Sequence, residues 1–114
     1  MTVNKDNIDL CLGLINGFRH IDPEFPLHYA LCFLLIAQDP GLSVSTLARR
    51  TGLPLSTVSR IVGALSDNRQ KGTAYKLVQT RISKTEKRRK ELYLTARGHA
   101  CLTKIHHIIS THAR

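Results

Sequence analysis

The sequence lacks the features of a membrane or exported protein. No apolar run approaches the length of about 18 residues that is needed to cross a bilayer. Its beginning, MTVNKDNIDL, has no basic segment followed by an apolar core, which is the pattern of an export signal. We therefore expect a cytoplasmic protein that does not act at a membrane.

Cysteine is scarce, and the residues present are widely and irregularly spaced. Cys11, Cys32 and Cys101 match neither a disulfide framework nor a paired-cysteine metal clip. Each stands among apolar neighbours, so we expect buried free thiols. A redox role would require a lowered thiol pKa, and nothing in the sequence indicates one.

Motifs of catalysis and metal binding are also missing. The chain has no Ser-His-Asp constellation, no Gly-rich phosphate loop and no paired carboxylate motif. Four histidines gather near the end, but no acidic or cysteine partner lies at metal-ligand spacing. We expect no enzymatic activity, no metal and no other cofactor. Solvent-facing or interface positions are predicted for these four histidines, His99, His106, His107 and His112. Their protonation at about pH 6 would offer a way to modulate a dimer.

Acidic residues are few, and the resulting positive charge is concentrated in one part of the chain. There are 17 Lys and Arg against 8 Asp and Glu, which gives a formal net charge of +9. Residues 69–104 hold eleven of the basic residues and two of the acidic ones, whereas residues 1–40 are net negative. This distribution is typical of a surface that faces polyanionic phosphate. A solvated basic face that only aids solubility is the simpler alternative.

The length and apolar periodicity indicate one domain over residues 1–114, with no internal repeat. Helical spacing predicts helices at about 7–21, 27–38 and 96–112. The helix at 27–38 is apolar nearly all round and is expected to be central and buried. The first and last helices have two apolar lines each, so one neighbour of each is expected to be a second subunit. Dimerisation is assigned to Leu10, Leu14, Phe18, Leu102, Ile105, Ile108 and Ile109.

The stretch SVSTLARRTGLPLSTVSRIVGAL has the pattern of two helices joined by a tight turn. Ser43 is suited to cap a short helix that ends at Arg50, and Gly52 permits the positive φ of the turn. Residues 42–44 form, at most, a brief strand. The second helix buries one stripe, Val58, Ile61, Val62 and Leu65, and keeps Ser56, Thr57, Ser59, Arg60 and Gly63 on its other faces. This is the pattern of a helix-turn-helix, whose second helix presents its N-terminal residues to base edges in the major groove; an ordinary helical hairpin is the alternative.

Two β-rich segments follow a polar stretch at residues 68–74, which is interpreted as a loop. Residues 75–83 and 88–95 flank Lys84–Lys87, so we predict a hairpin with a four-residue tip. The alternation in the second strand directs Leu92 and Leu94 to the core and the residues between them away from it. Thr95 is suited to cap the last helix.

The order of helix, helix, helix-turn-helix, basic hairpin and helix is a winged-helix order, and its motifs resemble the MarR family of bacterial transcription regulators. The resemblance extends from Leu27 to the end and is carried by LARRTGLPLSTVSRIVGAL, KLVQTR and EKRRKELYLTARG. It implies a mainly α fold with a small β-hairpin, in which residues 43–95 form the helix-turn-helix and wing. The N- and C-terminal helices would then join two subunits.

The resemblance also assigns DNA contacts. Arg88 matches the wing-tip arginine that in the family reaches toward the minor groove, where a narrow groove concentrates negative potential. Glu86 matches the acid, usually Asp, that braces this arginine. The recognition helix would meet the major groove through Ser56, Thr57, Ser59 and Arg60, and the wing would add Arg81, Lys84, Lys87 and Arg89.

The sequence therefore predicts a regulator that binds double-stranded DNA sequence-specifically. We expect a repressor that binds a pseudo-palindromic operator as a homodimer. The alternative is a winged-helix interaction or structural module in a replication, partition or other nucleoprotein complex. Nothing in the sequence supports a small-molecule effector.

Overall fold

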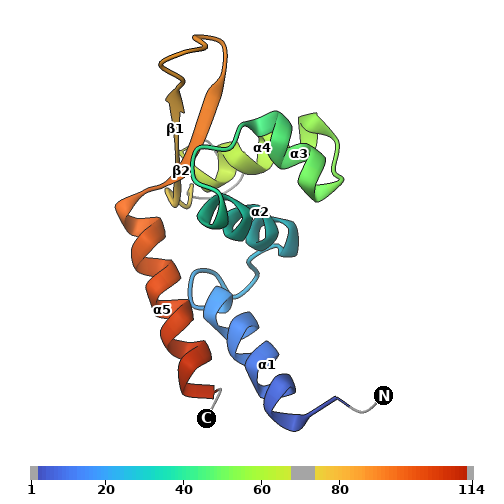
Figure 1. The fold of residues 1–114 in the computed structure, drawn as a ribbon. Helices are drawn as coiled ribbons and strands as arrows, with labels where there is room; N and C mark the ends of the chain where they lie inside the picture. The colour runs from blue at the N-terminus through green and yellow to red at the C-terminus, as the bar shows by residue number, and fades with distance from the viewer. Residues whose placement is uncertain (1–2, 68–73, 113–114) are drawn as a thin grey trace. The chain divides into compact units, whose positions relative to one another are not determined.

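A computed structural model describes residues 3–67 and 74–112 of the chain (Figure 1). The predicted loop at residues 68–74 lies outside the described residues, apart from Ala74. The chain divides into two compact units, one formed by Met1–Phe25 with His99–Arg114 and the other by Pro26–Gly98. The helix-turn-helix and wing predicted from the sequence lie within the second unit, together with the helix predicted at residues 27–38.

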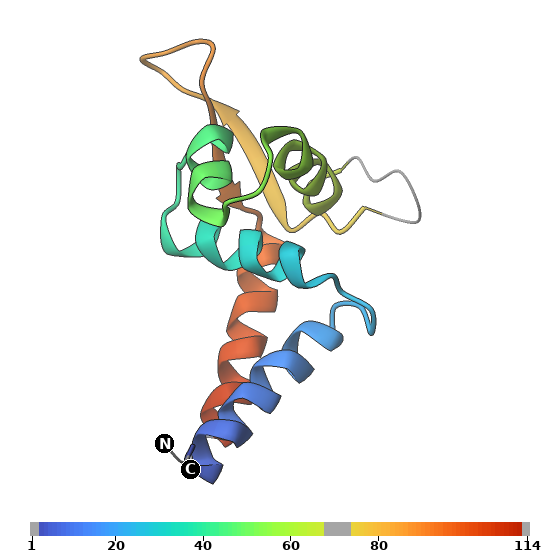
Figure 2. The same cartoon turned by 90° about the vertical axis from the view of Figure 1, so that its right-hand side faces the viewer.

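The first unit pairs helix α1 (Lys5–Arg19) with most of helix α5 (Ala96–His112). These helices lie side by side in two perpendicular views (Figures 1 and 2). They approach closely at Gly17, where an added Cβ would lie 3.0 Å from the Ile105 side chain. Helix α1 begins two residues before the predicted start, because the Asn4 side chain accepts a hydrogen bond from the backbone N–H of Asp6 and caps the helix there.

The second unit contains α2 (Leu27–Gln38), α3 (Val44–Thr51) and α4 (Leu55–Leu65), followed by β1 (Val78–Ile82) and β2 (Lys90–Leu94). The two strands pair antiparallel, from Val78 opposite Leu94 to Ile82 opposite Lys90. The hairpin rises beside the three helices (Figure 1). Side chains from every element meet in one core, whose largest fully buried members are Cys32, Phe33, Ile36, Leu47, Val58, Leu65, Leu77 and Leu92.

Helix α2 has the predicted bounds but not the predicted burial on all sides. Its buried residues, such as Phe33 and Ile36, face the core of the second unit. Leu27 and Leu31 are 81% and 39% exposed, respectively. An apolar sequence on every face therefore does not by itself show that every face is covered.

The helix-turn-helix agrees with the sequence prediction. The Ser43 hydroxyl accepts a hydrogen bond of 3.1 Å from the backbone N–H of Thr46 and caps α3. Gly52 ends α3 with a φ of 74°, the left-handed conformation that glycine adopts without strain. All four residues of the predicted stripe in α4 are buried.

The predicted brief strand before α3 exists as a single bridge. Ser43 pairs with Glu91, and the carbonyl oxygen of Leu92 accepts a 2.8 Å hydrogen bond from the N–H of Gly41. The N–H of Leu92 in turn donates to the carbonyl oxygen of Leu42 at 3.0 Å. These bonds attach the edge of the hairpin to the start of the helix-turn-helix.

The hairpin strands are shorter than the sequence predicted. The prediction ended the first strand at Ser83 and began the second at Arg88, whereas the strands end at Ile82 and begin at Lys90. The cause lies in Ser83, which is only 5% exposed. Its hydroxyl accepts hydrogen bonds from the N–H groups of Thr85 and Glu86, and a turn replaces the strand ladder there.

A junction of hydrogen bonds fixes the base of the hairpin to the end of α4. The N–H groups of Tyr75, Lys76 and Leu77 donate to carbonyl oxygens at the C-terminal end of α4, at 2.7–3.2 Å. Thr95 adds to the junction, because its N–H donates to the Leu77 carbonyl and its hydroxyl to that of Lys76. The same hydroxyl accepts from the N–H of Gly98, as expected for the cap of α5.

The cysteines only partly match their predicted burial. Cys32 is completely buried in α2, and this burial raises the pKa of its thiol to about 11, so the thiol stays protonated at neutral pH. Cys101 is half-buried, and Cys11 is exposed, which contradicts the prediction. Cys11 is exposed because it lies on the outer side of α1, away from the side that carries buried Gly13 and Gly17. No helix in the described part of the chain is long and apolar enough to span a membrane.

We expect Gly98→Ala to destabilise the second unit. An added Cβ would collide with the carbonyl oxygen of Leu77, a backbone atom that cannot move without breaking the junction. The expected loss is about 1–3 kcal/mol in the free energy of unfolding, measured by denaturant titration.

Gly52→Ala is the matched control, because nothing lies within 4 Å of its added Cβ and only the positive φ opposes the substitution. We expect this control to cost about 1 kcal/mol. A Gly98→Ala protein no less stable than the control would show that the close approach does not constrain the fold.

Candidate nucleic-acid interface

The outer face of α4 carries short polar residues and one arginine. Ser56, Ser59 and Arg60 are exposed, and Thr57 is half-buried. They are held outward because the opposite face of the helix supplies the core. Short side chains allow a flat surface to approach the helix closely, and the Arg60 guanidinium can donate two hydrogen bonds to one guanine.

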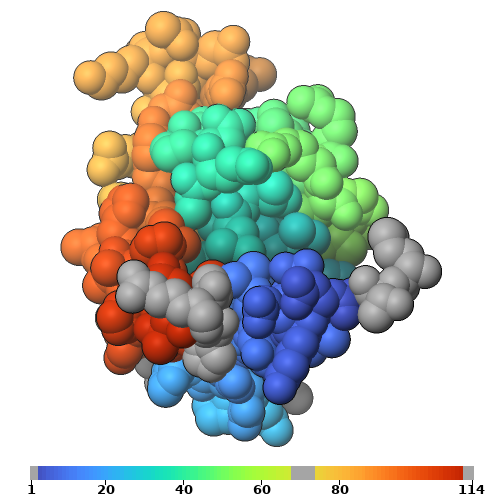
Figure 3. Space-filling model, turned by 60° about the horizontal axis from the view of Figure 1, so that its bottom comes forward, coloured from blue at the N-terminus to red at the C-terminus, as the bar shows by residue number. Residues whose placement is uncertain are grey.

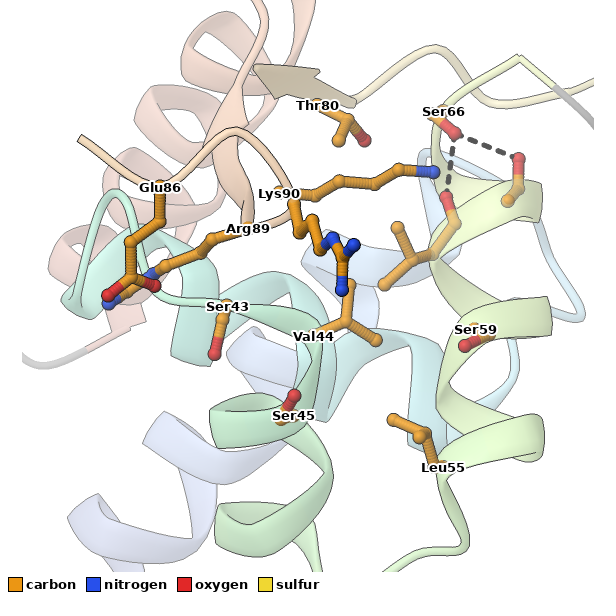
Figure 4. A pocket seen from close by; sticks show the side chains of 13 residues that line it. Ser43, Val44, Ser45, Leu55, Ser59, Ser66, Thr80, Glu86, Arg89 and Lys90 are labelled. Atoms are coloured by element: carbon orange, nitrogen blue, oxygen red, sulfur yellow. Dashed lines mark hydrogen bonds between the residues drawn. The ribbon is translucent and has the colours of Figure 1, made fainter. Parts of the chain in front are cut away.

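The outer half of the hairpin carries charge because the strand continues beyond the core. Leu92 and Leu94 are buried on one face of β2, and alternation places Lys90 on that same face, two residues nearer the tip. No core remains at that height, so Lys90 is exposed. Its side chain extends across toward the end of α4 near Ser66 (Figure 4).

A groove of about 710 Å³ separates the hairpin from the helices. One wall is the start of α3, with Ser43 and Ser45, and another is α4, with Ser59 and Ser66. The hairpin wall includes Arg88, Arg89 and Lys90, with one acid, Glu86, beside them. Figure 4 shows the hydroxyl-bearing and cationic side chains around this space. Hydroxyl donors and cations on facing walls suit an anionic ligand.

The wing tip is a defined turn that holds its cations outward. The N–H of Ser83 donates to the carbonyl oxygen of Arg89 at 2.9 Å, and the N–H of Arg89 donates to that of Glu86 at 2.9 Å. The Ser83 hydroxyl caps the turn from inside. Four basic side chains surround this turn and are all exposed: Lys84, Lys87, Arg88 and Arg89.

Arg81 lies on the other face of the hairpin from the groove. Its guanidinium carbon is 4.7 Å from the centre of the Tyr93 ring. The Tyr93 hydroxyl donates to a Glu91 carboxylate oxygen at 3.1 Å, and this hydrogen bond raises the pKa of Tyr93 above its ordinary value. Arg81, Tyr93 and Glu91 thus form a small cluster that stiffens the hairpin on that face.

The structure brings together some of the predicted DNA contacts but not all. Ser59, Arg88 and Arg89 line the groove together with Glu86. Ser56 and Arg60 lie on the exposed face of α4, while Lys84 and Lys87 lie at the tip. Glu86 and Arg88 form no ion pair; the ion pair among the described residues joins Arg50 to Asp39. The bracing role of Glu86 therefore stays a prediction.

Sequence reasoning missed Lys90 and Ser83. Lys90 stands directly after Arg88 and Arg89, and the strand alternation would have placed it on the side of Leu92. The capping role of Ser83 has a weaker signal, a Ser-x-Thr pattern at the end of a strand, which is also common in ordinary loops.

The predicted dimerisation residues differ in exposure. Phe18 and Ile105 are buried within the first unit, where the Phe18 ring stacks on Phe25 with centroids 5.6 Å apart. Leu10 is 37% exposed, and the other four predicted residues are half-buried. More exposed apolar residues lie elsewhere on α1, at Ile8, Leu12 and Ile15.

The histidines of α5 form no metal site in the structure. His99, His106 and His107 are exposed, and the side chain of His112 lies outside the described part of the chain. Among residues 3–67 and 74–111, no three His, Cys, Asp or Glu side chains come close enough to hold a metal ion.

The helix-turn-helix matches a known family model. Residues 34–70 match the model described as the IclR helix-turn-helix domain, which covers α3, the turn and α4. No protein of curated function matches the chain.

Solved structures match most of the chain. RV1404 from Mycobacterium tuberculosis superposes with a TM-score of 0.75 at 18% identity, over 90% of this chain and 65% of that one. MepR from S. aureus, solved as a complex with DNA, matches with a TM-score of 0.73 at 16% identity, over 92% of this chain and 79% of that one. A MarR family transcription regulator matches with a TM-score of 0.68 at 18% identity, over 92% of this chain and 62% of that one. The chain thus spans less than two thirds of the length of RV1404 and of this regulator.

The order of elements and these superpositions define a winged helix-turn-helix protein. Helix α4 holds the place of the recognition helix, and the β1–β2 hairpin is the wing. The fold is that of the MarR-like winged-helix regulators, as the motifs predicted.

We expect Ser83→Ala to loosen the wing tip while leaving the rest of the protein folded. The substitution removes the acceptor for the N–H groups of Thr85 and Glu86, at a local cost of about 1 kcal/mol. Amide hydrogen exchange followed by NMR should become several-fold faster at these two residues.

Thr85→Ala is the control, because it removes a hydroxyl beside Ser83 but leaves the Ser83 acceptor in place. Exchange at Glu86 should be unchanged in this variant. Equal exchange in the Ser83→Ala and wild-type proteins would mean that the hydroxyl does not hold the tip.

Proposed function

We propose that this protein binds double-stranded DNA sequence-specifically and represses transcription by occluding a promoter as a homodimer. One observation carries the proposal: Ser59 on the outer face of α4 and the cations Arg88 and Arg89 of the wing line the same groove. A surface of this kind offers hydrogen-bond donors for base edges beside cations for phosphate.

Docking follows from the geometry of the helix-turn-helix. Helix α4 enters the major groove with its first turns against base edges, where Ser56, Ser59 and Arg60 are exposed. The phosphate backbone that borders the major groove then lies against the basic wing. Arg88 at the tip reaches the adjacent minor groove, whose negative potential favours a guanidinium. MepR, which shares this fold, was solved as a complex with DNA, and this supports DNA as the partner.

Dimerisation follows from the unpartnered apolar face of α1. Ile8, Leu12 and Ile15 are 47%, 52% and 55% exposed, at positions i, i+4 and i+7 of the helix. The blue surface of α1 is visible in Figure 3. A second copy that covers this face would give two recognition helices, which suit half-sites about 34 Å apart on a pseudo-palindrome.

We expect the Arg60→Ala, Arg88→Ala double variant to lose at least tenfold in affinity for an operator selected from random DNA. Each arginine is expected to contribute about 1–3 kcal/mol through guanine or the minor groove. The measurement is a gel shift or fluorescence anisotropy titration over a range of salt concentrations. Wild-type affinity should fall steeply with salt, and the double variant should show a shallower slope.

An Arg19→Ala, Lys104→Ala variant is the matched control, because it removes the same charge from exposed positions in the first unit. Its affinity should stay within about threefold of the wild type, the change expected from net charge alone. Wild-type binding that ignores salt, or equal losses in both variants, would contradict DNA binding through α4 and the wing.

We expect Leu12→Asp to dissociate the dimer, because a buried carboxylate on an apolar interface lacks a partner. Sedimentation equilibrium should give the mass of one chain for this variant and of two chains for the wild type. Asn7→Asp adds the same charge to an exposed polar position of α1, on a different side of the helix from Leu12, and should remain dimeric. A wild-type protein with the mass of one chain would rule out the homodimer.

A further inference from the structure

Leu55 is out of place on the surface of the recognition helix. All of α4 is described, and among its exposed residues Leu55 alone is apolar. Its side chain is 55% exposed, whereas Val58, Ile61 and Leu65 on the core side are at most 2% exposed. Leu55 therefore adds little to the core that the helix supplies.

The start of the helix does not require a leucine at position 55 either. Leu55 is the first residue of α4, after Pro54, which occupies the N-cap position and provides no side-chain hydrogen bond. First-turn positions favour residues that accept from free N–H groups or carry negative charge, and leucine does neither. A polar residue would serve the helix start equally well and would avoid an apolar surface in water.

The position of Leu55 matches a contact with a base. It lies one turn before Ser59 on the same face, and both residues line the groove beside the wing. In Figure 4 its side chain points from the first turn of α4 into this groove. The N-terminal turn of a recognition helix is the part that meets base edges.

We infer that Leu55 recognises the C5-methyl group of a thymine in the major groove. That methyl group is the apolar feature of the major groove, and apolar side chains contact it in direct readout. Burying one methyl group against leucine corresponds to about a fourfold gain in affinity for each half-site. Thymine recognition by Leu55 depends on the proposed function, because it requires α4 to enter the major groove.

The test replaces single thymines of the selected operator by 2′-deoxyuridine, which lacks only the C5-methyl group. With the wild-type protein, one thymine in a half-site should respond with about a fourfold loss of affinity. With Leu55→Ala, the operator should bind more weakly, and the same replacement should have no further effect. This non-additivity distinguishes a direct contact from general weakening.

Leu27→Ala provides the matched control. Leu27 is also the first residue of a helix after a proline N-cap, and it is 81% exposed in α2. This variant should keep the wild-type response to deoxyuridine. Circular dichroism of both variants should show intact helices.

Three outcomes would overturn thymine recognition by Leu55 and leave the proposed function standing: a specific operator without any responsive thymine, an unchanged response in Leu55→Ala, or an equal loss of the response in Leu27→Ala. Failure of the proposed function has a different signature. In that case, no sequence is enriched from random DNA, and the Arg60→Ala, Arg88→Ala variant binds DNA like the wild type.

Discussion

The backbone hydrogen bonds between the end of α4 and Tyr75–Leu77 are the constraint on which the proposed DNA-binding surface depends. A helix leaves its last carbonyl groups without partners, and here the incoming segment of the hairpin supplies the donors. Thr95 joins the returning strand to the same place. These hydrogen bonds fix the position of the wing relative to α4. The hairpin is fixed to the end of α4 from Tyr75 onward.

The hairpin has an anchored half next to the core and a charged half beyond it. Along β2 the same face carries Leu94, Leu92 and then Lys90, and only the first two meet the core. Beyond the core this face is exposed, at Lys90 and at its cross-strand neighbour Ile82, which is 66% exposed. The basic cluster and the alternating strand therefore belong together. The apolar half of the hairpin sets the distance between the basic residues and α4.

Much of the fold could be predicted from the sequence because its signals are local. The bounds of α2 and α5, the Ser43 cap, the turn at Gly52 and the buried stripe of α4 follow from spacing and capping chemistry within a few residues. Features that depend on distant partners were missed or wrong. The position of Lys90 in the groove can be predicted only when the end of the core is known. Cys11 is exposed because only one side of α1 packs within its unit. The junction after α4 joins segments that are not adjacent in the sequence, and no local motif predicts their pairing.

In the proposed complex, affinity and specificity come from different residues of this surface, and they depend on each other. The wing and its neighbours provide charge, which attracts any phosphate backbone and weakens with salt. Helix α4 exposes one arginine, so in the proposed complex most of the base contacts fall to short hydroxyl side chains and Leu55. Short groups make contact only when the helix axis comes close to the base edges. In the proposed complex the wing cations, which cannot distinguish sequences, hold the helix close enough to the base edges for the short side chains to make contact.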